Sequence, residues 1–298
     1  MADMDDLPTL EQDDQLAEPL RRVSYEAGMM LGLEATRDEQ AYHRRRLTRH
    51  QYWLQGFGTL AGLNVSMSPE SHADANENTR VRLHVSPGIA IDGLGREVML
   101  HETYCIDLRQ WLDAQTEASL LEGYDGGPGH LWLKVTIRHK DCALARQPVL
   151  ARKLNLSTDA VQPSRTADSV QLELIPERPP TEDNRYQPWA SHVPVTDTLP
   201  VLSSEEDATL QAATAASAAA GAQLALHARL LHALDGNGLS TRNLADELES
   251  GARLLLARIR LEVSQPDDII VNPERIQINN LVRPFIATAS QLAWLHRQ

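Results

Sequence analysis

The sequence is poor in cysteine, in aromatic residues and in long apolar runs, and each shortage excludes a class of protein. Cys105 and Cys142 are the two cysteines among 298 residues, too few for a disulfide framework or a four-cysteine zinc site. Phe, Trp and Tyr make up 4% of the residues, so Leu, Val, Ile and Ala must build the core. No apolar run has the length needed to cross a bilayer.

Positive charge is also scarce. The chain has 28 Lys and Arg against 41 Asp and Glu, for a net charge of −13, which predicts no general binding to nucleic acid or anionic lipid. One local cluster departs from this balance and predicts a solvated or inter-subunit face paired with acidic groups, with nucleic-acid contact as the alternative. This possible interface comprises Tyr42, Arg44, Arg45, Arg46, Arg49 and Trp53.

Residues 1–20 are rich in Asp, Glu and Pro. We expect a flexible acidic tail that orders only against a partner. The segment lacks the basic-then-apolar layout of a signal peptide. A cytoplasmic protein is therefore expected, one that leaves the cell only by lysis or inside an assembly.

Hydrophobic periodicity predicts an α+β fold, with an N-terminal helix followed by an antiparallel β domain. Helix formers run from a possible cap at Thr36 to a stop at Gly56. Alternating residues then predict strands, including "GHLWLKVTIRHKD" and its expected neighbour "SVQLELIPE". Residues 142–168 between these two strands are too many for an ordinary hairpin loop, so we expect a loop that contacts a partner.

Prolines concentrate over residues 179–202, which excludes helix and central strand and predicts a linker. The sequence predicts four parts: the tail over 1–20, a helix plus β-rich domain over 21–178, this linker, and a mainly helical domain over 203–298. The last part is expected to contain an Ala-rich helix after a capping box at "SSEE", a second helix over 240–263, a short extended piece and a terminal helix.

The segment "SPGIAIDGLGREVML" over residues 86–100 predicts a β-hairpin. Its structural residues are Pro87, Gly88, Asp92, Gly93, Gly95, Arg96 and Glu97. Asp92 can accept backbone hydrogen bonds within its own turn, and Arg96 can pair with Asp92 or Glu97. Asp92 and Glu97 could alternatively serve as catalytic carboxylates, but turn chemistry explains both.

The remaining motifs predict no metal, no cofactor and no catalytic residue. The "DGNG" stretch at Asp235 fails the ligand spacing of a calcium loop in either register. His43 and His50 lie two helical turns apart, too far to share one ion easily, even with Glu39 nearby. His227 and His232 are no better placed, and no phosphate loop or nucleophile elbow occurs.

Two segments carry a family resemblance. "YEAGMMLGLEATRDEQAYHRRRLTRHQYWLQGFGTLAGLNV" and "VSPGIAIDGLGREVML" resemble a family of mostly uncharacterised bacterial proteins associated with phage-tail-like contractile injection systems. The likeness extends through the central strands, over residues 25–179. The opening of the first segment is also similar to the start of the type VI secretion baseplate adaptor. The chain departs from the family pattern at Gln55, where a His is usual, and at His139 to Asp141, where an aromatic and a Glu are.

The resemblance implies a non-enzymatic structural or adaptor component of a contractile particle, near its baseplate, fibre or spike. It also implies an oligomer or a complex with baseplate, sheath, spike or fibre proteins, in a particle that is released or docked at a membrane. Two alternatives remain open. One is a cell-wall-directed hydrolase using Asp92 and Glu97, and the other is a glycan-binding module using the five Trp residues as stacking platforms.

Overall fold

The structure is a computed structural model that describes residues 22–68, 81–126, 129–148, 161–179, 199–232, 251–263 and 275–295. The chain divides into two compact units. The first contains residues 1–186 and 246–298, and the second contains residues 187–245. Helices and antiparallel sheets both occur, which confirms the predicted α+β class.

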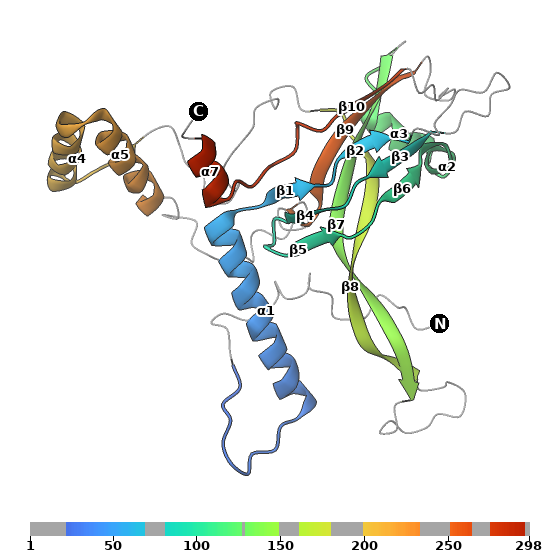
Figure 1. Cartoon of the computed structure of the whole chain (residues 1–298), viewed down its shortest axis with the longest axis horizontal. Coiled ribbons are helices and arrows are strands. Elements are labelled where there is room, and N and C mark those ends of the chain that lie inside the picture. The colour runs from blue at the N-terminus through green and yellow to red at the C-terminus, as the bar shows by residue number, and fades with distance from the viewer. Residues whose placement is uncertain are drawn as a thin grey trace. The chain divides into compact units, whose positions relative to one another are not determined.

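The largest sheet of the first unit has four antiparallel strands in the order β10-β9-β7-β8 (Figure 1). These strands are β7 (Gly129–Pro148), β8 (Val161–Pro176), β9 (Leu254–Val263) and β10 (Ile276–Asn279). Alternate residues of β7 face the core, since Leu131, Leu133, Val135 and Ile137 are all buried. The predicted strand and its predicted neighbour β8 are thereby confirmed.

Two three-stranded sheets pack with this one, in the orders β1-β4-β5 and β2-β3-β6. Their strands are β1 (Gly58–Gly62), β2 (Val65–Met67), β3 (Arg82–Val85), β4 (Gly88–Ile91), β5 (Glu97–Leu100) and β6 (Tyr104–Asp107). Buried aliphatic residues from all three sheets form one continuous core, with Leu83, Val98 and Ile259 as examples.

Capping residues set the ends of the helices in the first unit. Helix α1 (Leu33–Gln55) has Gly56 as its C-cap, as expected, but its N-cap is Gly32 rather than Thr36. Helix α2 (Leu108–Asp113) is capped by the side chain of Asp107. Thr116 caps a separate helix, α3 (Glu117–Gly123).

The second unit contains the helices α4 (Ser204–Ala216) and α5 (Ala218–His232). The predicted capping box is present, formed between Ser203 and Glu206. The single Ala-rich helix that was predicted is wrong, because Ser217 adopts an extended conformation and its hydroxyl accepts a hydrogen bond from the Ala220 N–H of the next helix. The two helices then pack against each other, with Gly221 close to Thr214.

Two further sequence predictions need correction. The helix predicted over 240–263 is wrong in its second half, because residues 254–263 form strand β9 in the middle of the main sheet. Residues 246–298 accordingly belong to the first unit and include β10 and the short helix α7 (Ala289–Leu295). The loop predicted over 142–168 is instead a continuation of β7 and β8 on both sides. The acidic tail and most of the proline-rich linker lie outside the described residues.

Candidate functional site

The β4–β5 hairpin has a buried ion pair at its turn. The Nε of Arg96 donates to the Oδ2 of Asp92 over 2.7 Å, and these side chains are 4% and 0% exposed. The other carboxylate oxygen accepts hydrogen bonds from the backbone N–H groups of Leu94 and Arg96, each at 2.9 Å. Desolvation by burial raises the pKa of Asp92 above its ordinary value of 3.8, against the lowering effect of Arg96 and these backbone donors.

This turn joins three separate parts of the first unit. Gly95 has a φ of +78°, and a Cβ there would lie 2.0 Å from the carbonyl oxygen of Thr48 on α1. The N–H of Gly93 donates to the carbonyl of Gly251, just before β9, over 2.8 Å. The hairpin, the C-terminal half of α1 and the approach to β9 are therefore locked together at one point.

The remaining turn residues have lesser roles. Gly88 lies against the backbone of Gly62 and Leu63, where a side chain would collide. Pro87 is exposed, and Glu97 is exposed at the start of β5. Asp92 thus has no surface with which to reach a substrate, and Glu97 does not share its environment. This geometry gives no support to a catalytic carboxylate pair.

A groove of about 930 Å³ opens between the outer face of the main sheet and the segment around Ile106 and Trp111. Its two carboxylates are each held by two cations. Glu173 pairs with Arg138 at 3.2 Å and Arg253 at 3.0 Å. Glu177 pairs with Lys134 and, at 3.4 Å, with Arg258. These pairings cross-link the lining of the groove, and four cations against two carboxylates give the six groups a net charge of +2.

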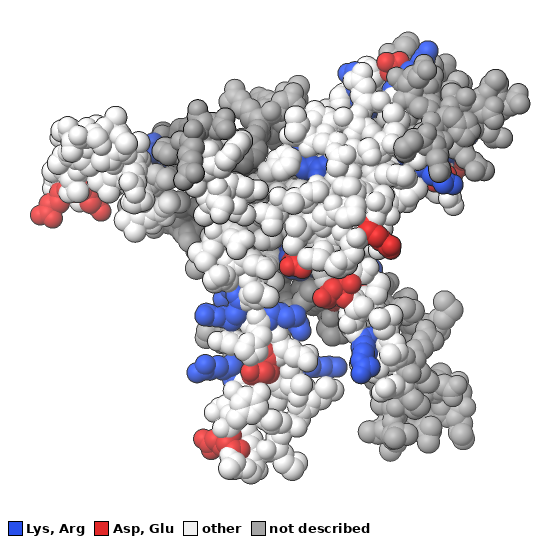
Figure 2. All heavy atoms as spheres, viewed as in Figure 1, with Lys and Arg blue, Asp and Glu red and all other residues white. Residues whose placement is uncertain are grey.

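Helix α1 carries the predicted basic interface, and Figure 2 shows Lys and Arg side chains gathered over it. Arg46 is exposed, whereas Arg44, Arg49 and Tyr42 are half-buried. Arg45 is only 7% exposed and lies on the face of α1 that Tyr52 also buries. The side chain of Trp53 lies outside the described residues. The cluster is therefore divided between two faces of the helix.

No protein-family profile fits the chain, and no curated protein matches it in sequence.

Apolar side chains are exposed along α1 and the segment before it. Leu47 and Leu54, seven residues apart on one face, are 59% and 71% exposed, and Met30 is 94% exposed. Figure 1 shows the N-terminal part of α1 extending away from the sheets. An exposed apolar stripe of this kind on a helix is typical of a surface that contacts another element or another chain.

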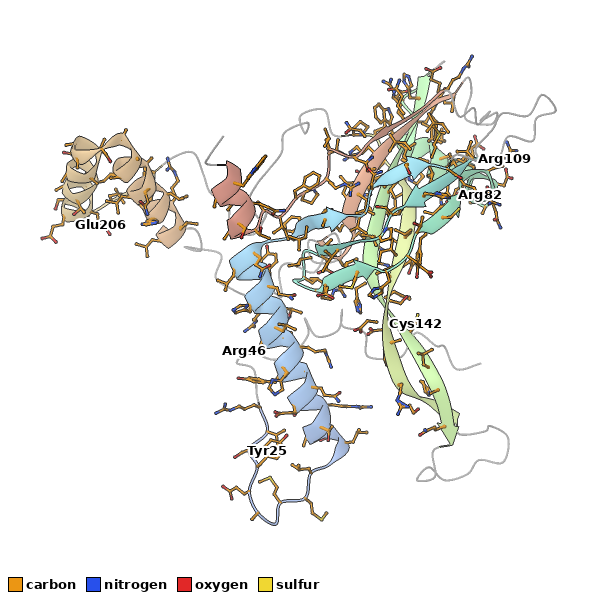
Figure 3. All side chains as sticks on the ribbon, viewed as in Figure 1. Tyr25, Arg46, Arg82, Arg109, Cys142 and Glu206 are labelled. Atoms are coloured by element: carbon orange, nitrogen blue, oxygen red, sulfur yellow. The ribbon has the colours of Figure 1, made fainter. Side chains whose placement is uncertain are left out.

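Strands β7 and β8 form a two-stranded ribbon beyond the main sheet. Strand β9 accompanies β7 only as far as Ile137, whereas pairing with β8 continues to Pro148 and Val161. Figure 3 labels Cys142 on this ribbon, which extends from the sheet like an arm. An isolated two-stranded ribbon is marginally stable in water. This ribbon arm, defined as residues 138–148 and 161–171, is therefore a second element suited to a partner.

Three Trp side chains are described by the structure, and they lie in different environments. Trp111 packs against the core, and Trp132 lies beneath the guanidinium of Arg260, 5.7 Å from the ring centroid. Trp294 is exposed on α7.

Within the described part of the chain, no helix is both long and apolar enough to span a membrane.

Sequence reasoning missed one cluster of polar residues. His139, Asp141 and Asp168 lie together where the ribbon arm begins. The alternation of His139 and Asp141 on one strand could have been noticed, but placing Asp168 beside them requires the register of β8.

Proposed function

We propose that this protein is a non-enzymatic structural or adaptor component of a phage-tail-like contractile injection particle, near the baseplate, fibre or spike. The three-sheet core serves as a rigid body. Helix α1 and the ribbon arm serve as contact elements for neighbouring tail proteins. The protein is made in the cytoplasm and enters a particle that is released or docked at a membrane.

The observation that carries this proposal is the exposure of apolar side chains on the extended elements. Leu47 and Leu54 on α1 and Leu144 on the ribbon arm are each more than half exposed. Leaving such surface in water forgoes the stabilisation of about 25 cal/mol per Å² that burial gives. A partner that covers these elements would supply this stabilisation. The sequence around α1 and the β4–β5 hairpin resembles proteins of contractile injection systems, and this resemblance supports the kind of assembly proposed.

The alternative functions lack an equivalent observation. A hydrolase using Asp92 would need a carboxylate that solvent can reach, and Asp92 is wholly buried. A glycan-binding module would need exposed aromatic rings on a common face, and Trp132 is already covered by Arg260. The contacts of Asp92 and Trp132 therefore favour the adaptor function over both alternatives.

Light scattering of the purified full-length chain tests the proposal, alone and mixed with the products of neighbouring genes. We expect a discrete oligomer or a mixed complex of fixed mass. A variant carrying Leu47→Glu and Leu54→Glu should keep its thermal stability, because both side chains are exposed, yet lose the complex. A monomer that ignores those proteins, or a complex unaffected by the two changes, would count against the proposal.

A further inference from the structure

The cluster of His139, Asp141 and Asp168 lies at the base of the ribbon arm. His139 and Asp141 are alternate residues of β7, so their side chains share one face of the ribbon. Asp168 is the direct cross-strand partner of Asp141 on β8. Directly opposed carboxylates repel each other, and a sheet gains stability when something between them offsets the repulsion.

The histidine points into the space between these carboxylates. Its Nε2 lies 3.8 Å from Asp141 Oδ1 and 3.7 Å from Asp168 Oδ1. One ligand atom from each of the three residues lies within 4.8 Å of the other two. Both distances from Nε2 exceed hydrogen-bond length, and His139 makes no hydrogen bond within the described structure although it is only 7% exposed. A ring nitrogen that is not engaged in a hydrogen bond is available as a metal ligand.

A metal ion would satisfy all three groups. We propose that His139, Asp141 and Asp168 bind a divalent transition-metal ion, with Zn²⁺ as the best match. Zinc binds imidazole nitrogen and carboxylate oxygen at about 2.0–2.2 Å in tetrahedral geometry, which places neighbouring ligand atoms about 3.4 Å apart. The two distances from Nε2, 3.8 and 3.7 Å, need to shrink by only a few tenths of an ångström, and the two carboxylates already lie within 4.8 Å of each other.

The donor set and exposure define the site further. One imidazole with two carboxylates favours Zn²⁺ or a similar ion over Ca²⁺ and Mg²⁺, which prefer oxygen ligands alone. The Asp168 side chain is 91% exposed, so water can complete the coordination sphere from the solvent side. The ion would cross-link β7 to β8 just beyond the end of β9, stiffening the ribbon arm where it leaves the sheet. This inference is independent of the proposed function.

Isothermal titration of the full-length protein with Zn²⁺ tests the site, together with thermal unfolding with and without the ion. The wild type should bind one Zn²⁺ at this site and unfold at a higher temperature when it is bound. Asp168→Asn should keep the metal-free fold, because the side chain is exposed, and should weaken this binding at least about tenfold, the effect that even outer-shell partners of a metal can have. Asp141→Asn should do the same.

Two controls separate this site from other zinc binding. Asp113→Asn removes an exposed carboxylate on α2, and Cys142→Ser removes an exposed thiol adjacent to Asp141 in sequence. Both should leave the affinity unchanged. No binding by the wild type, or equal binding by the wild type and both Asp variants, would overturn the proposal.

Discussion

The Nε of Arg96 lies 2.7 Å from the Oδ2 of Asp92, and the two side chains are enclosed by the turn that joins α1, the β4–β5 hairpin and the approach to β9. An ion pair removed from water to this degree has a large cost of desolvation, which only its own partners offset. The first unit therefore depends on this pair for the alignment of α1 with its sheets.

Replacing Asp92 should destabilise the protein severely. Asp92→Ala leaves the Arg96 guanidinium without its counter-ion and removes the acceptor of two backbone N–H groups, so the free energy of unfolding should fall by about 3–5 kcal/mol. Glu97→Ala is the matched control, since Glu97 is exposed, and should change it by less than about 0.5 kcal/mol. Urea denaturation measures both. Equal effects of the two changes would contradict the structural role of Asp92.

The buried carboxyl also predicts a pH dependence. Because burial raises its pKa above 3.8, folded Asp92 keeps its proton at pH values where the unfolded chain has lost it. Its contribution to stability is therefore greatest below pH 3.8 and falls as the pH rises through the folded pKa. The difference in unfolding free energy between the wild type and Asp92→Ala, measured by denaturation at a series of pH values from 3.8 upward, should become smaller as the pH rises. An advantage that widens instead would mean a lowered pKa.

Asn280 should be essential to the joint between β2 and the C-terminal segment. Its side chain accepts from the Val65 N–H and donates to the Val65 carbonyl, both at 2.9 Å, and the buried Arg283 donates to its Oδ1. Asn280→Ala leaves these groups unsatisfied and should cost about 2–3 kcal/mol of unfolding free energy. Asn279→Ala removes one exposed hydrogen bond, to the Leu281 N–H. This change should lower the free energy of unfolding by about 0.5–1 kcal/mol. A similar decrease in both variants would contradict the special role of Asn280.

Shortening the ribbon arm should separate binding from folding. Replacement of residues 143–166 by Asn-Gly joins the cross-strand pair Cys142 and Ala167 through a turn that suits a two-residue hairpin. The core includes none of the described residues of this segment, 143–148 and 161–166, so the melting temperature should change by no more than a few degrees. Complex formation with tail proteins should be lost. Unchanged complex formation would remove the ribbon arm from the interface.

The sequence predicted the elements whose pattern is local. The buried alternation of Leu131, Leu133 and Val135 and the turn chemistry of Asp92 and Arg96 are both read from neighbouring residues. The C-terminal strand β9 was missed because "LLLARIRLEV" has an apolar run and strong helix formers, and only its central place in the sheet decides between helix and strand.

The polar clusters likewise combine residues that are close in sequence with residues that meet only in the folded chain. His139 and Asp141 are two residues apart, but Asp168 joins them only through the register of β7 and β8. That register depends on pairing along the whole hairpin. Likewise, Arg45 was placed with its basic neighbours by composition, whereas the face of α1 on which it is buried depends on tertiary packing.

Quantitative mass spectrometry of intact contractile particles, sedimented from the native cell, tests the central claim most directly. The adaptor account predicts that this chain co-sediments in a fixed ratio to the baseplate and sheath proteins, and that the ratio survives a high-salt wash. Recovery of the chain in the supernatant, with the particles intact and free of it, would contradict the account.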